Sequence, residues 1–301
     1  MFTFDMLVQV SETILRRVVV TVGAAVFLLS LIMLPLTGHA NVTGSSDAGA
    51  PTQPLWMVVL PLAVGAVLAL LIPPRPRESH QLTGPRSVVL RRMGLLVGLA
   101  VLFPLVIGVG GLGHSGWYLI LKMALLLLVP AVAFRFLRDK NQPAKLPRWF
   151  PRSRLPWLAP IPVIAGWALL TYVGPLAAPV PTIQQYPDPV YVAIAAVLTF
   201  LTASVAEEIF YRYLLQTHIE AIFGQWAGII VSALLFALMH VPTHGGGGAP
   251  WVVVATAVSI QGVGGAFLGL LWARYCNIWA SIAVHTMING LPVVLYFFTL
   301  S

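Results

Sequence analysis

The sequence predicts an all-α fold, a polytopic transmembrane bundle of about eight or nine helices. Of its 301 residues, 58% are hydrophobic and only 9% are charged, whereas an average soluble domain carries about 25% charged residues. The apolar residues are gathered into stretches of about 20, the length that an α-helix needs to cross a bilayer. This composition excludes an ordinary soluble enzyme, and its high hydrophobicity excludes intrinsic disorder.

Apolar segments that we expect to be the spans follow one another along the whole chain. In order they are Val18–Leu36, Leu55–Ile72, Met93–Leu112, Trp117–Phe134, Trp157–Leu176, Tyr191–Glu220, Trp226–Val241, Trp251–Trp272 and Ile278–Phe298. Gly38-His39-Ala40, after the first, resembles a signal-peptide cleavage site. The apolar stretch before it is longer than the usual 7–15 residues and more spans follow, so we expect an uncleaved first helix.

Short turns and linkers separate the later spans. Pro143–Pro156 carries four prolines among basic residues, which is typical of a linker. A turn is expected near Phe223-Gly224, between the sixth and seventh spans. Pro242 and Pro250 flank a run of glycines, so no helix continues through that loop. Arg274–Asn277 is expected to form the turn before the last span.

The basic residues sort to alternate loops. They precede the first span and fill the 74–92 and 135–156 loops, whereas the 37–54, 113–116 and 177–190 loops have none. The positive-inside rule therefore places the N-terminus in the cytoplasm. Topology explains the net charge of +8, so we expect contact with the lipid bilayer and no nucleic-acid partner. The single cysteine, Cys276, excludes a disulfide framework and a Cys-based zinc site.

Ionisable side chains within the spans indicate function, because each costs about 2.5–3.5 kcal/mol to insert. They concentrate in the last hundred residues, with Asn289 as a polar companion: Glu207, Glu208, Arg212, His240 and His285. Lys122 lies about five residues into the fourth span, where its long stem is expected to carry the ammonium to the outer interface.

The first cluster is Glu207-Glu208-Ile-Phe-Tyr211-Arg212. Glu208 and Arg212 are four residues apart, so they share a helix face and are expected to pair. Glu207 lies about 100° further around the helix, has no cation on that helix, and shares its face with Tyr211, which could donate a hydrogen bond. A carboxylate in this setting is suited to general acid–base catalysis. The alternative is that both glutamates are hydrated at the interface.

Two further polar groups lie on later spans. Glu207 and His240 are about equally far from the turn at Phe223-Gly224, so a helical hairpin places them at similar depth. His285 and Asn289 share one helix face and can both donate to an oxyanion, although interhelical hydrogen bonding is an equal alternative. His285 reaches the depth of Glu207 only if the turn before it lies inside the membrane or the helices tilt.

This constellation suits hydrolysis. Glu207, assisted by His240, would take a proton from water, and His285 and Asn289 would stabilise the oxyanion. Glu207, His240 and His285 could also hold zinc with a water in the fourth position, although the HExxH zinc-protease pattern is absent. Metal is therefore compatible with these residues and is not required by them.

The three motifs together resemble the CPBP (Abi) family of intramembrane proteases, which includes the CAAX prenyl endopeptidases. They are Glu207-Glu208-x-x-x-Arg212, Phe236-x-x-x-His240 and His285-x-x-x-Asn289, spread over Ala195–Pro292.

The resemblance implies an intramembrane endopeptidase, glutamate-dependent or metal-dependent, that acts on membrane-associated peptides or proteins in a bacterial plasma membrane. It implies catalytic roles for Glu207, His240, His285 and Asn289. The ion pair of Glu208 and Arg212 would support them, as would Phe236, which would shape the site. Residues 157–301 would form the protease core, and residues 1–156 would be N-terminal helices of no assigned role.

Two other function classes stay open. A proton-coupled transporter could use the same Glu and His residues as a relay, although no inverted repeat is evident. A non-catalytic bacteriocin-immunity or scaffold protein could share the fold, although the motif residues are all retained.

Overall fold

A computed structural model describes residues 4–44, 52–72, 82–139, 142, 144–151, 153–174, 176–177, 188–243 and 248–299, with side chains from residue 12 to residue 290. Helices occupy each of the predicted spans, and the only strands in these ranges are the two-residue β1 (Asn41–Val42) and β2 (Gln53–Pro54), which pair antiparallel. The predicted all-α membrane bundle is confirmed.

The helices are bounded as follows, with η marking π-helical segments. They are α1 (Phe4–Leu36), α2 (Leu55–Leu71), α3 (Arg86–Val109), α4 (Gly116–Met123), η2 (Ala124–Leu128), α5 (Val129–Phe136), α6 (Leu155–Leu158), α7 (Ile161–Tyr172), α8 (Pro189–Thr199), η4 (Phe200–Val205), α9 (Ala206–Glu208), η5 (Ile209–Gln216), α10 (Thr217–Phe223), α11 (Gln225–His240), α12 (Pro250–Ala257), η6 (Val258–Gly262), α13 (Val263–Tyr275) and α14 (Ile278–Thr299). By length and composition, six helical rods in the described ranges can cross a membrane, and the helices at 55–71 and 225–240 are shorter.

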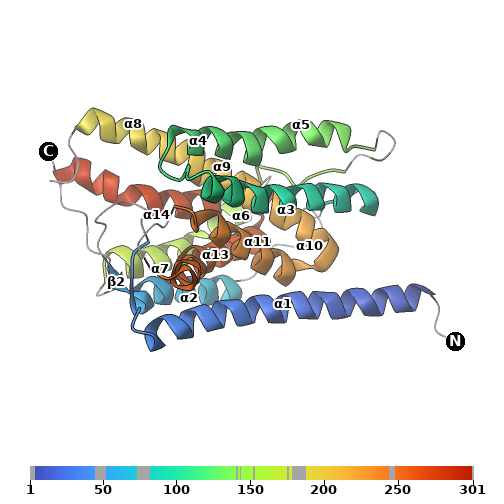
Figure 1. Cartoon of the computed structure of the whole chain (residues 1–301), viewed down its shortest axis with the longest axis horizontal. Helices are drawn as coiled ribbons and strands as arrows, with labels where there is room; N and C mark the ends of the chain where they lie inside the picture. Colours follow the sequence, from blue (N-terminus) through green and yellow to red (C-terminus); the bar gives the residue numbers. More distant parts are fainter. Residues whose placement is uncertain are drawn as a thin grey trace.

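The centre of the bundle is the pair α11 and α13, which pack on each other. Figure 1 shows α1 along one side of this pair and α4, α5 and α8 along the other. Helix α11 also contacts α1 and α3, and α13 contacts α2. The helices on either side of the basic linker therefore share one bundle.

Three of the rods are α-helices interrupted by π-helical turns. The rod from Pro189 to Phe223 contains two such turns, η4 and η5, on either side of the three-residue α9. A π-helical turn adds a residue to the helical turn, re-aims the side chains beyond it, and occurs frequently at functional sites. The two adjacent glutamates lie in α9, at the point where the helix geometry changes twice.

The turn at Gly224 has the position expected from the sequence. Gly224 adopts φ of 83°, a left-handed conformation that favours glycine, and joins α10 to α11. A side chain here would also meet Arg16 of α1, whose Cζ lies 2.7 Å from the position of an added Cβ. The first helix is thus seated on this hairpin.

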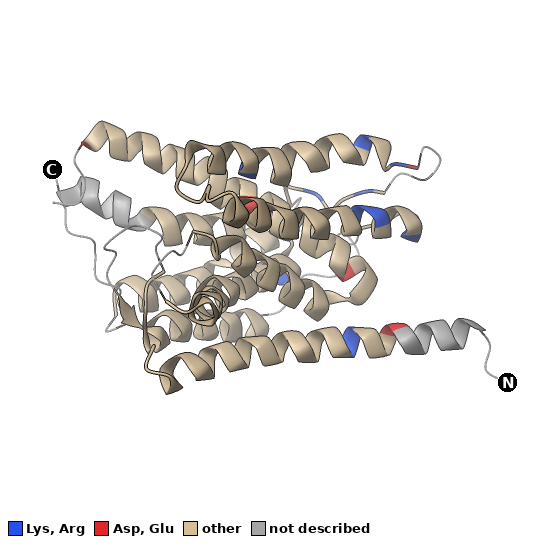
Figure 2. Ribbon diagram, in the orientation of Figure 1, with Lys and Arg blue, Asp and Glu red and all other residues tan. Residues whose placement is uncertain are grey.

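Lys and Arg residues lie mostly at one end of the bundle, the end at which α1 begins (Figure 2). The opposite end is nearly free of them in the part of the chain that is described. This is the distribution that the alternating loops predict.

Arg274 caps the C-terminus of α2. Its Nε donates to the Ala69 carbonyl at 3.1 Å, and its Nη2 donates to the carbonyls of Leu70 and Ile72 at 3.0 and 2.9 Å. These oxygens have no partner within the helix, so the guanidinium satisfies them.

Replacement of Arg274 by Met is expected to destabilise the protein by about 1–3 kcal/mol, because the helix-end carbonyls lose a charged donor. Thermal unfolding of the purified protein in detergent measures this as a lower midpoint. Arg135→Met, at an exposed position near the end of α5, is the matched control. A midpoint for Arg274→Met equal to that of the control would contradict the capping role.

Candidate active site

The two adjacent glutamates of α9 are buried. Glu207 is 2% exposed and Glu208 is 0% exposed, without counting any lipid. The alternative that they are hydrated at the membrane surface is therefore wrong. A buried carboxylate needs a cation or several hydrogen bonds, so their partners decide what the site can do.

Glu208 pairs with Arg212, as its spacing predicts. Arg212 Nη1 lies 3.2 Å from Glu208 Oε1, and Arg212 Nη2 donates to the Gly265 carbonyl at 3.2 Å. The guanidinium also stacks on the Phe236 ring, 4.4 Å from its centroid. Gly265 permits this close approach, because an added Cβ would lie 3.1 Å from the Phe236 ring. The ion pair of Glu208 and Arg212 is therefore buried between α13 and α11.

Glu207 pairs with Lys122, a contact that sequence reasoning missed. The ammonium of Lys122 forms an ion pair with Glu207 Oε1. The expectation that Lys122 reaches the outer interface is wrong. Lys122 is 5% exposed, and its side chain points from α4 into the bundle, where it meets Glu207. A usable signal was present: Glu207 and Lys122 were the two charges within the spans that had no partner on their own helix.

Tyr211 packs beside the site and does not bond to Glu207. Its buried hydroxyl has no hydrogen-bond partner among the described residues, so the expected donation to Glu207 is not formed. Its ring meets Phe236 edge-on at 5.2 Å, and its carbonyl accepts from Ser232 Oγ at 2.7 Å. Tyr211 therefore supports the hairpin of η5 and α11.

His285 meets both glutamates. Its Nδ1 lies 2.8 Å from Glu208 Oε1, and its Nε2 lies 3.8 Å from Glu207 Oε2. The turn before α14 is buried within the protein: Asn277 is 2% exposed and donates to the Pro156 carbonyl at 3.0 Å. The last helix thus starts inside the protein and needs only two turns to reach the carboxylates.

His240 ends α11 and points Nδ1 back along its own helix. This nitrogen lies 2.8 Å from the Phe236 carbonyl. A carbonyl oxygen can only accept, so Nδ1 carries the hydrogen, and Nε2 is the nitrogen that can gain or lose a proton. The His240 ring lies edge-on to Phe236, the same side chain that meets His285, so His240 lies beside the site.

Phe236 holds these groups together. Its ring centroid lies 4.8 Å from that of His240 and 5.9 Å from that of His285, both edge-on. The same ring carries the Arg212 guanidinium. The expected role of Phe236 in shaping the site agrees with this geometry.

Asn289 lies one turn beyond His285 on α14. It is half-buried, and its side chain forms no hydrogen bond within the described part of the chain. The structure therefore brings together Glu207, Glu208, Arg212, Phe236, His240 and His285. Among the described residues, the Asn289 side chain forms no hydrogen bond to them.

The zinc site considered for Glu207, His240 and His285 is not formed as a ligand group. Among the described residues, no three His, Cys, Asp or Glu side chains are placed to share a metal ion. Lys122 holds Glu207 Oε1 and Glu208 holds His285 Nδ1, so the donors left for a metal would be Glu207 Oε2 and the Nε2 atoms of the two histidines.

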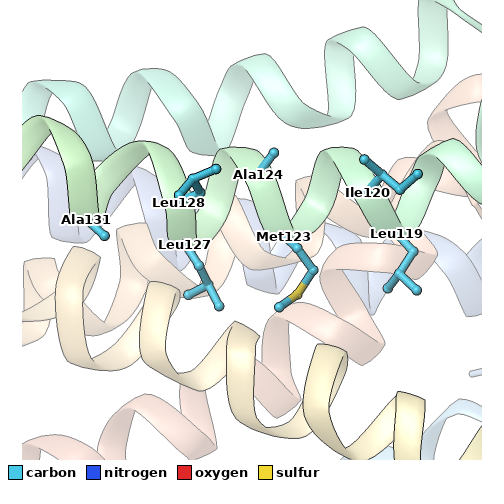
Figure 3. Close-up of a pocket in the computed structure, with 7 residues that line it drawn as sticks. All are labelled: Leu119, Ile120, Met123, Ala124, Leu127, Leu128 and Ala131. Carbon is cyan, nitrogen blue, oxygen red and sulfur yellow. The ribbon is translucent and has the colours of Figure 1, made fainter.

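An apolar pocket lies elsewhere, along the rod of α4, η2 and α5. Figure 3 shows its lining side chains, which are Leu119, Ile120, Met123, Ala124, Leu127, Leu128 and Ala131. None of the polar residues of the site lines it. A surface of this composition suits lipid chains and offers no group for catalysis.

Comparison with protein families gives a match for residues 189–291, to the family described as Type II CAAX prenyl endopeptidase Rce1-like. This segment is similar to the Rce1-like endopeptidase domains. The resemblance to the CPBP family is thus confirmed, and the domain contains all the motif residues. No curated protein and no solved structure matches the chain. Lys122 lies outside the matched segment, although it contacts Glu207 within it.

Removal of Arg212 is expected to cost more stability than removal of the whole pair. Arg212→Met leaves Glu208 buried without its cation and should lose about 3–5 kcal/mol, whereas Glu208→Gln with Arg212→Met should lose less. A double-mutant cycle of denaturant unfolding in mixed micelles measures the coupling. Additive losses for the two single substitutions would contradict a direct interaction.

Proposed function

We propose that the protein is an intramembrane endopeptidase that hydrolyses a peptide bond in membrane-associated peptides or proteins, in the manner of CAAX processing. The observation that supports this best is the state of Glu207. One of its carboxylate oxygens is held by Lys122, while the other, Oε2, is buried without a hydrogen bond and faces His285. An acceptor oxygen kept in this condition inside a membrane is suited to activating water.

Glu207 is the proposed general base. It takes a proton from the water whose oxygen attacks the substrate carbonyl, and it returns that proton to the nitrogen of the departing amine. Catalysis by a positioned acid or base contributes about 10²–10⁴-fold. His240 assists through Nε2, since its Nδ1 is engaged with the Phe236 carbonyl.

His285 and Asn289 are the proposed donors to the oxyanion. Glu208 is a carboxylate that accepts, so His285 Nδ1 donates to it. Nε2 is then the nitrogen that faces the reacting carbonyl, and it donates to the oxyanion in the form of the ring in which both nitrogens carry a hydrogen. Asn289 lies one turn further along the same helix, so both can address one substrate. Glu208 and Arg212 act through His285: they fix the ring that donates.

The basic end of the bundle is proposed to lie in the cytoplasm, with the chain in a bacterial plasma membrane. Lys and Arg gather at that end (Figure 2), as the positive-inside rule requires. Substrates would then be membrane-anchored chains whose cleavage site enters the bundle from the lipid.

Glu207→Gln is expected to abolish cleavage while the protein stays folded, because the amide cannot accept the proton from water. The measurement is cleavage by purified protein in lipid vesicles of a peptide library that includes S-farnesylated peptides ending in Cys-a-a-Met, with and without a chelator. A loss of at least about 10²-fold is expected, and His240→Ala should also lose activity. The chelator arm tests for a metal.

Cleavage that persists in folded Glu207→Gln would contradict the assigned base. Absence of cleavage by the unaltered protein on the whole library, with Glu207→Gln equally stable, would favour an immunity or scaffold protein. Loss of proton flux without any cleavage would favour a transporter.

The orientation is expected to place residue 138 inside and residue 114 outside the cell. In a Cys276→Ala background, a membrane-impermeant maleimide added to intact cells should label His114→Cys and spare Arg138→Cys, both of which are exposed positions. Labelling of both after lysis is the control. The reverse pattern in intact cells would overturn the proposed orientation.

A further inference from the structure

We infer that Lys122 is a positioning residue of the active site: it fixes Glu207 through Oε1 and so reserves Oε2 for the reacting water. This inference rests on the proposed function. Lys122 lies in α4, in the part of the chain that the family match does not cover. Its contact with Glu207 is therefore a property of this chain that the motifs do not reveal.

The charges of the site form two pairs of different kinds. Glu208 takes its cation from its own helix, four residues away, whereas Glu207 takes Lys122 from another rod. A second cation on the same helix would neutralise Glu207 equally well. The cross-helix pair also fixes where Glu207 points relative to His285, because α4 and α14 approach α9 from separate directions.

The chemistry of lysine matters here. An ammonium is a compact point charge that can neutralise a carboxylate through a single oxygen. A guanidinium is a planar fork whose geometry matches both carboxylate oxygens, although Arg212 pairs with only Oε1 of Glu208. The structure shows Oε1 of Glu207 engaged and Oε2 buried with no hydrogen bond. A lysine at position 122 neutralises the carboxylate without occupying the oxygen that faces His285 Nε2.

Tyr118 secures the lysine. It lies one turn earlier on α4, and its ring centroid is 5.5 Å from Lys122 Nζ, within the range of a cation–π interaction. The Tyr118 ring in turn packs against Phe103 of α3 at 5.5 Å. The position of Nζ is thus set by two helices of the N-terminal half.

The test compares Lys122→Met, Lys122→Arg and Tyr118→Leu with the unaltered protein, using the farnesylated peptides above in lipid vesicles. Lys122→Met is expected to lower kcat about 10²-fold with little change in KM, because a small displacement of a catalytic group has this cost. Lys122→Arg is expected to keep the thermal stability but not kcat, since the guanidinium takes both oxygens. Tyr118→Leu keeps both charges and should lower kcat several-fold.

A purely structural lysine predicts a different pattern, in which Lys122→Arg restores stability and kcat together. That result would overturn the inference, as would an unchanged kcat in folded Lys122→Met or, should both Lys122 variants fail to fold, in folded Tyr118→Leu. Arg135→Met, the exposed cation of the same rod, is the control that should retain activity. Glu207→Gln assayed in parallel separates the two claims: if it is inactive while the Lys122 and Tyr118 variants behave as the unaltered protein, only the positioning role fails.

Discussion

Two neighbouring carboxylates buried in an apolar bundle impose the constraint on which this structure depends. Neither Glu207 nor Glu208 can stay ionised there without a cation, because charge in a medium of low dielectric is costly unless it is paired. Both glutamates therefore need a partner, and the two partners, Arg212 and Lys122, come from different parts of the fold. Of the two, only Lys122 ties the rod that contains α9 to another rod.

The two pairs have different structural consequences. The pair of Glu208 and Arg212 is closed within one rod and is covered by the Phe236 ring and the Gly265 carbonyl. The pair with Lys122 joins that rod to α4. The segment that matches the protease family is therefore not self-contained in this chain: the helices before it supply a cation to its carboxylate and share its core.

In both histidines of the site, one ring nitrogen forms a hydrogen bond that fixes the ring and the other stays available. Each uses Nδ1 to fix its ring, His285 on Glu208 and His240 on the Phe236 carbonyl. This leaves Nε2 of each ring available, and that of His285 faces Glu207. Fixing one ring nitrogen determines what the other can do, as it does for histidines in many active sites. Phe236 lies edge-on to both rings, so a single apolar side chain sets the direction of the two imidazoles.

The sequence alone determined the membrane class, the helical segments and the residues that carry charge into the bundle, because these depend on local composition and on spacing along one helix. The pair of Glu208 and Arg212 was predictable for the same reason, being one turn apart. Only the tertiary structure decided that Lys122 meets Glu207, that Tyr211 packs instead of donating, and that His285 bonds to Glu208. Those outcomes depend on the orientation of each helix about its own axis and on the depth at which it begins. The hydrophobic pattern of the sequence determines neither the orientation nor the depth. The π-helical turns beside α9 and the buried turn before α14 set these rotations and depths, and they therefore decide which groups the glutamates meet.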